Sequence, residues 1–131
     1  DPAAAKAKYG PIASWDVSEV TNMSYLFLGQ AAFNEDLSRW EVGKVQHMTS
    51  MFADAASFNG DLSRWEVGQV KTMAYMFCGA TSFNGDLSRW EVGQVRSMRD
   101  MFHGAASFNR QLGGAWPTST VDQHAMGINV R

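Results

Sequence analysis

Large apolar residues recur along this chain at one fixed interval, which the tryptophans at positions 15, 40, 65 and 90 define. Residues that stand 25 positions apart form columns, and several columns hold a single residue type through four copies. Two of them make up the predicted core: Trp15, Trp40, Trp65 and Trp90, followed by Phe27, Phe52, Phe77 and Phe102. A period between about 20 and 50 residues indicates a tandem array of structural units. The pattern therefore predicts four 25-residue repeats over residues 12–112.

Each repeat contains two local patterns. In residues 39–42 the apolar Trp40 and Val42 alternate with charged residues, which favours a short half-buried strand. Val45, Met48 and Met51 then follow at intervals of three, which is typical of one apolar stripe on a short helix. Because the strand recurs at the same point of every repeat, neighbouring copies should pair in parallel, with the helices on the opposite side. The predicted fold class is an α/β solenoid.

The two ends of the chain depart from the pattern. Residues 1–11 lack the repeat and predict an N-terminal extension or cap. Trp116 stands one position later than the period would place it after Trp90, so the register slips by one, and residues 113–131 predict a degenerate capping repeat. Terminal units of an array have to cover an open core and are usually atypical.

The repeat, written WEVGxVxxMxxMFxxAxxFNxDLSxW, resembles that of the BspA-like surface proteins. The resemblance covers about residues 12–112 and implies a leucine-rich-repeat-like right-handed solenoid. It also implies a role in adhesion or protein binding without enzymatic activity, and a place outside the cell or at its surface.

Composition narrows the possible functions. The 131 residues carry a formal net charge of −2, which argues against a nucleic-acid partner because such a partner requires a basic face. Cys78 is the only cysteine, so no internal disulfide forms, and no apolar run is long enough to span a membrane. No nucleophile elbow, phosphate loop or paired-carboxylate motif occurs, so we expect no enzyme and no cofactor.

Two sets of residues could in principle bind a metal ion. The columns beginning at Asn34 and Asp36 offer oxygen ligands for calcium, but turn capping and an internal Asn hydrogen-bond ladder explain them better. His47, His103 and His124 fall in different columns, so zinc is not expected. We predict no metal.

Two rows of charges flank the predicted strand. They consist of Arg39, Arg64 and Arg89 beside Glu41, Glu66 and Glu91. One interpretation is a self-neutralising surface that discourages aggregation. The other is a partner-binding face, because repeat proteins commonly bind partners along such a surface.

The sequence thus predicts a non-catalytic module for protein–protein interaction or scaffolding. One alternative is a small structural subunit of a larger assembly, such as an organellar or photosynthetic complex, peripherally associated and located in a plastid. A second alternative is a carbohydrate-binding surface module, suggested by the five tryptophans. The sequence does not identify the partner or the compartment.

Overall fold

The computed structural model describes residues 2–114, 116–117 and 125–127. It opens with the helix α1 (Pro2–Tyr9), followed by the short 3-10 helix η1 (Ile12–Ser14). From residue 15 onwards, the described chain consists mainly of turns and extended segments, with three isolated parallel bridges.

The predicted fold class, an α/β leucine-rich-repeat-like right-handed solenoid, is wrong. Within the described residues there is no sheet, and neither the strand at 39–42 nor the helix through Val45, Met48 and Met51 is present. The backbone around residue 40 instead closes a turn, because the Trp40 N–H donates to the Leu37 carbonyl at 3.1 Å.

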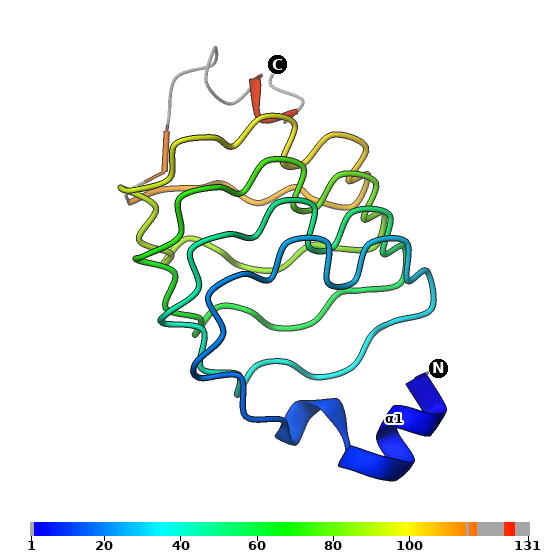
Figure 1. Ribbon diagram of the computed structural model, residues 1–131. Coiled ribbons are helices and arrows are strands. Elements are labelled where there is room, and N and C mark those ends of the chain that lie inside the picture. Colours follow the sequence, from blue (N-terminus) through cyan, green and yellow to red (C-terminus); the bar gives the residue numbers. More distant parts are fainter. Residues whose placement is uncertain (1, 115, 118–124, 128–131) are drawn as a thin grey trace.

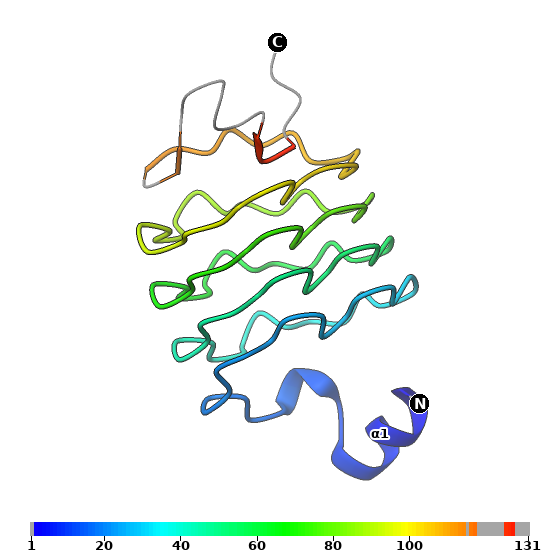
Figure 2. The same cartoon turned by 45° about the horizontal axis from the view of Figure 1, so that its top comes forward.

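The 25-residue period appears in space as a series of similar layers. Successive repeats lie one above another, with the blue N-terminal segment at one end and the orange segment beyond residue 110 at the other (Figure 1; Figure 2). The single bridge position in each interval joins equivalent residues of adjacent repeats, from Asn22 to His47, Thr72 and Ser97.

Backbone hydrogen bonds join each layer to the next along one side. The N–H groups of Met23, Tyr25, Phe27 and Gly29 donate to carbonyl oxygens of the second layer, each at 2.9 Å. The same four bonds recur from the second layer to the third and from the third to the fourth. Residues that are far apart in sequence therefore satisfy one another's backbone groups, as buried backbone requires.

Consecutive tight turns occupy the segment predicted to be helical. The Leu26 N–H donates to the Met23 carbonyl at 3.3 Å, and the Leu28 N–H donates to the Tyr25 carbonyl at 3.2 Å. Tyr25 has a φ of 66° and Gly29 a φ of 73°, in the left-handed region that interrupts a right-handed helix. Every second N–H thus closes a local turn, and the others reach the next layer.

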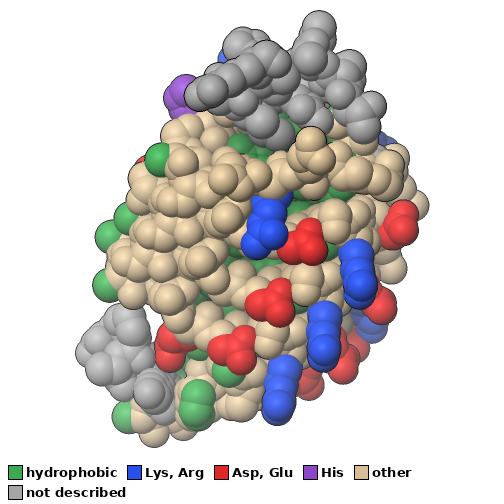
Figure 3. Space-filling model, turned by 180° about the vertical axis from the view of Figure 1, so that it is seen from behind, with side chains coloured by type: hydrophobic (Ala, Val, Ile, Leu, Met, Phe, Trp, Pro, Cys, Tyr) green, Lys and Arg blue, Asp and Glu red, His purple; other side chains and the backbone are tan. Residues whose placement is uncertain are grey.

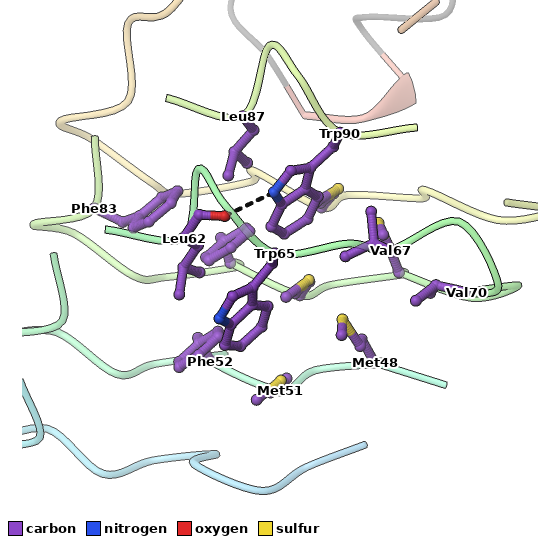
Figure 4. Close-up of a cluster of buried hydrophobic side chains, with 14 of the residues drawn as sticks. Met48, Met51, Phe52, Leu62, Trp65, Val67, Val70, Phe83, Leu87 and Trp90 are labelled. Atoms are coloured by element: carbon purple, nitrogen blue, oxygen red, sulfur yellow. Dashed lines mark hydrogen bonds between the residues drawn. The ribbon is translucent and has the colours of Figure 1, made fainter. Parts of the chain in front are cut away.

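Aromatic rings fill the interior as continuous stacks. The Trp65 and Trp90 ring centroids lie 6.4 Å apart with planes 4° from parallel, and Phe52 and Phe77 lie 5.6 Å apart at 3°. From Trp40 onwards, each indole N–H donates to a carbonyl one layer earlier, as Trp90 does to Leu62 at 2.9 Å (Figure 4). Buried tryptophans usually find such a partner for the N–H.

Most of the predicted core columns lie inside the molecule. The buried members are Trp40, Trp65, Trp90, Phe27, Phe52, Phe77 and Phe102. Trp15, in the first repeat, is only half-buried; its indole N–H donates to the Gly10 carbonyl at 3.2 Å.

The far end of the stack departs from the pattern, as the sequence does. Trp116 is buried in spite of the one-residue slip in register, and its indole N–H donates to the Leu87 carbonyl at 2.7 Å. The carbonyls of Ala125 and Met126 accept from the fourth layer. Much of the predicted capping repeat at 113–131, including His124, lies outside the described residues.

Candidate interaction face

The two predicted rows of charges lie on the surface. All six side chains are exposed: Arg39, Arg64, Arg89, Glu41, Glu66 and Glu91. Basic and acidic side chains form neighbouring rows across the layers on the face that Figure 3 shows. The rows run along the stack because each layer repeats the same turn at the same place.

In the second, third and fourth repeats, a short turn and the residue that follows it hold one arginine and one glutamate outward. Leu37 and Trp40 are buried and joined by the backbone bond that closes the turn, so Arg39 between them points to solvent. Just before the turn, the Asp36 carboxylate accepts from the Ser38 N–H at 2.9 Å. The same bond joins Ser63 to Asp61 and Ser88 to Asp86, which gives each of the three arginines the same local support.

Hydrogen bonding favours the charged form of the supporting carboxylates. Bonds from the Ser38 hydroxyl and backbone N–H hold the pKa of Asp36 below its ordinary value, with a smaller contribution from the Arg39 charge. The pKa of Asp61 is lowered in the same way by Ser63. A carboxylate that accepts hydrogen bonds is stabilised in its ionised form.

Two open hollows lie along the rows. The larger, of about 660 Å³, is lined by Arg39, Glu41, Lys44, Arg64 and Glu66 among others. The second, of about 420 Å³, shares Glu66 with the first and adds Arg89 and Glu91. The structure therefore brings all six predicted residues to the rims of two adjoining hollows, with Trp40 and Trp65 contributing to their linings.

The six charged side chains do not neutralise one another by direct contact. Among the described residues, ion pairs join Lys44 to Glu19 at 2.9 Å and Arg99 to Asp100 at 3.8 Å, and neither includes a member of the rows. Charged groups at an exposed surface gain little from pairing in water. Arg39, Glu41 and their repeats thus remain solvated.

Sequence reasoning missed the ion pair at the rim of the larger hollow. Lys44 and Glu19 occupy one column in adjacent repeats, and that column continues as Gln69 and Gln94. The signal was present, because opposite charges in adjacent copies of one column face each other in a stack. A search for columns that hold one residue type overlooks this pair, because Glu19 and Lys44 are of different types.

The columns considered for calcium make hydrogen bonds within the chain. The Asn34 side-chain oxygen accepts from the Asn59 N–H at 2.9 Å, and Asn59 accepts from Asn84 in the same way at 2.8 Å. The Asn ladder is thus present, but it lies at or near the surface and not, as predicted, in the interior. In the part of the chain that the structure describes, no three His, Cys, Asp or Glu side chains gather in a metal-binding cluster.

Cys78 is half-buried and lies apart from the charged rows. Burial raises the pKa of its thiol, and the nearby carboxylates of Asp54 and Asp100 raise it further. The thiolate is the reactive form of cysteine, so these surroundings disfavour nucleophilic chemistry.

Comparison with known proteins places the chain in a repeat family. The family model described as "Mycoplasma protein of unknown function, DUF285" matches residues 3–126. This family is related to the BspA-like repeat proteins. No curated protein and no solved structure matches the chain significantly. Within the described residues, no helix has the length and apolar character needed to cross a membrane.

Proposed function

We propose that this chain, which belongs to the DUF285 family of Mycoplasma proteins of unknown function, is a non-catalytic protein-binding module of the BspA-like kind. Its interaction face consists of the two charged rows and the two hollows between them. The bound partner would be a protein that offers complementary charges at the interval set by the layers.

The observation that carries this proposal is the regular array of solvated charges on a well-packed scaffold. In the described chain, three arginines and three glutamates are exposed without ion pairs among them, above a core in which Phe52, Leu62 and Val70 have no solvent exposure. A partner whose charges match this spacing gains specificity and association rate from electrostatic complementarity.

The burial of the tryptophans gives the carbohydrate-binding alternative little support. That alternative required exposed tryptophan faces, on which sugar rings could pack, but Trp65 is 3% exposed and stacks on Trp90. A structural subunit would use the same face as an adhesion module. The two alternatives differ in the partner protein and in the compartment where that partner lies.

Affinity capture with charge-reversed variants tests the proposal. The full chain and the Arg39→Glu/Arg64→Glu variant are used as baits against surface and soluble fractions, followed by quantitative mass spectrometry. A partner that uses the rows is captured by the native chain and lost with the variant, because like charges then face it. Recovery only from surface fractions supports adhesion, and a stoichiometric soluble complex supports the subunit alternative.

The matched control is Arg96→Glu/Arg99→Glu, which changes the net charge equally and affects exposed residues that line neither hollow. This control should retain the partner, and all three proteins should unfold at the same temperature. Equal loss of the partner from both variants, or retention by both, would contradict the assignment of this face.

A further inference from the structure

The two ends of the stack differ in their backbone groups. In the later layers, the carbonyls of His47, Thr49, Met51 and Ala53 each accept a hydrogen bond from the layer before. The corresponding carbonyls of the first layer, which we term the acceptor edge, accept none from the described residues; they belong to Asn22, Ser24, Leu26 and Leu28.

A backbone donor beside the acceptor edge is also unpaired. The N–H groups of Gln46, Lys71 and Arg96 each donate to the equivalent residue of the preceding layer, at 2.7–2.8 Å. Thr21 holds this position in the first layer, and its N–H has no partner among the described residues. The edge therefore carries four acceptors and one donor in the order found at every internal junction.

Apolar side chains are exposed along the same edge. Leu26 is 48% exposed and Val20 is 37% exposed, whereas Met51 and Val45 in the same columns are fully buried. Met76 is also fully buried, and it lies, as Met51 does, between two layers. The described residues place a repeat layer before Met51 and Met76 but none before Leu26.

We propose that the acceptor edge docks a further 25-residue repeat of this same kind, presented by another polypeptide. Such a repeat supplies N–H groups at every second residue and an apolar side chain over Leu26. The three internal junctions show that these groups match. Addition of a chain to an unpaired backbone edge is an established mode of recognition.

The opposite end of the stack argues against a second copy of this chain as the partner that docks on the acceptor edge. The donors of the fourth layer that would meet the acceptor edge include the N–H groups of Asp100 and Phe102. Both are already engaged, at 2.9 and 2.8 Å, by the carbonyls of Ala125 and Met126. The occupant is therefore a repeat whose donor side is uncovered.

Insertion of one repeat into the full chain tests the proposal with a defined probe. A copy of residues 37–61 is placed between Pro11 and Ile12, which keeps the register and gives the probe a high effective concentration. Hydrogen exchange of the Thr21 amide is the readout, because docking gives that N–H a partner. We expect it to slow by about tenfold or more, while the Lys71 amide, bonded in both proteins, serves as reference.

Two further variants make the result specific. A glycine–serine insertion of the same length at the same point should leave Thr21 exchange as fast as in the native chain. Leu26→Lys in the repeat-extended chain should speed it again, because a charge is buried at the junction. Rapid Thr21 exchange in the extended chain, whether its added repeat folds elsewhere or not at all, would overturn the proposal. So would self-association of the native chain that Leu26→Lys abolishes, since the occupant would then be a second copy.

Discussion

The first and second repeats have nearly the same sequence pattern and the same local geometry but different burial. Phe27 and Phe33 stack at 4.1 Å in the first repeat, and Phe52 and Phe58 stack at 4.2 Å in the second. Yet Phe33 is half-buried where Phe58 is fully buried. The intralayer contact is therefore a property of the repeat, whereas exclusion of water is a property of its neighbours.

This difference shows how the stack is stabilised. The turns in one layer bury little by themselves, and half of the backbone donors along one side find partners only in the next layer. Repeat arrays derive much of their stability from such interfaces between units. Substitutions in matched columns of the first and second or third layers should therefore separate local from interfacial contributions.

The largest contrast is expected in the Trp column. Trp65→Ala removes a buried indole, its stack on Trp90 and its 2.9 Å bond to the Leu37 carbonyl, and should lower the free energy of unfolding by about 3–5 kcal/mol. Trp15→Ala removes a half-buried ring and should cost about 1–2 kcal/mol. Urea denaturation followed by circular dichroism measures both; equal losses would mean that the layers contribute alike.

The next contrast lies in the column of Leu26 and Met51. Met51→Ala should destabilise the protein by about 2–5 kcal/mol, because a cavity forms between two layers. Leu26→Ala removes a largely exposed side chain and should change stability by about 0.5 kcal/mol or less. Urea denaturation measures the stability of both variants. A loss of more than about 2 kcal/mol in the free energy of unfolding of Leu26→Ala would show that the Leu26 side chain is covered in solution.

Backbone strain should show the opposite result, with no difference between layers. Ser50 has a φ of 54° and Tyr25 a φ of 66°, a region that costs a residue with a Cβ about 1–2 kcal/mol. Replacement by glycine relieves that cost but adds chain entropy to the unfolded state, for a net gain of roughly 0.5 kcal/mol. Ser50→Gly and Tyr25→Gly should each raise the thermal midpoint slightly, with Ser57→Gly, at an exposed residue without a positive φ, as a control that lowers it.

The smallest effect should come from the Asp–Ser turns. Hydrogen bonds from Ser18 and Ser63 lower the pKa values of Asp16 and Asp61 from the ordinary 3.8. Because the folded-state pKa is depressed, this stabilisation is complete above about pH 3.8 and is lost as the pH falls below it. Thermal midpoints measured between pH 6 and pH 2.5 should fall less steeply for Asp61→Asn than for the native chain.

The comparison sharpens with Asp16, which accepts the same kind of hydrogen bond from Ser18 in the first repeat, in the column that holds Glu41 in the second. Asp16→Asn should flatten the profile as much as Asp61→Asn does, because both bonds lie within one layer. A larger effect at Asp61 would mean that the charge interacts with neighbouring layers.

The sequence predicted the repeat, its core columns and the exposed rows, because each depends on which residues recur. The columns of Trp65 and Phe77 are apolar in every copy, and the interior of the stack is the region that shields them from water. The hollows depend on how far apart neighbouring turns lie, which no spacing in the sequence encodes.

The predicted helix failed for a specific physical reason. Val45, Met48 and Met51 recur at every third position, an interval that one helix stripe and a run of tight turns both produce. The chain forms tight turns here and not a helix, because backbone groups find partners in adjacent layers, as the Phe52 N–H does at the Met76 carbonyl. Local periodicity carries no information about such partners. The column of positive φ values at Ser50 and Tyr75 was equally hidden, since neither residue type favours that region.

At each internal junction, the four backbone bonds that run from the earlier layer to the later one outnumber those that run back, such as the bond from the Gln46 N–H to the Thr21 carbonyl, and this gives the molecule a net electrical polarity. Alternate peptide units, such as those joining Asn22 to Met23 and Leu26 to Phe27, point their carbonyls toward the first layer and their N–H groups toward the last. Their dipoles add along the stack, as they do along the axis of a helix. The first layer therefore ends in partial negative charge, which favours cations there and repels an approaching copy of the same end.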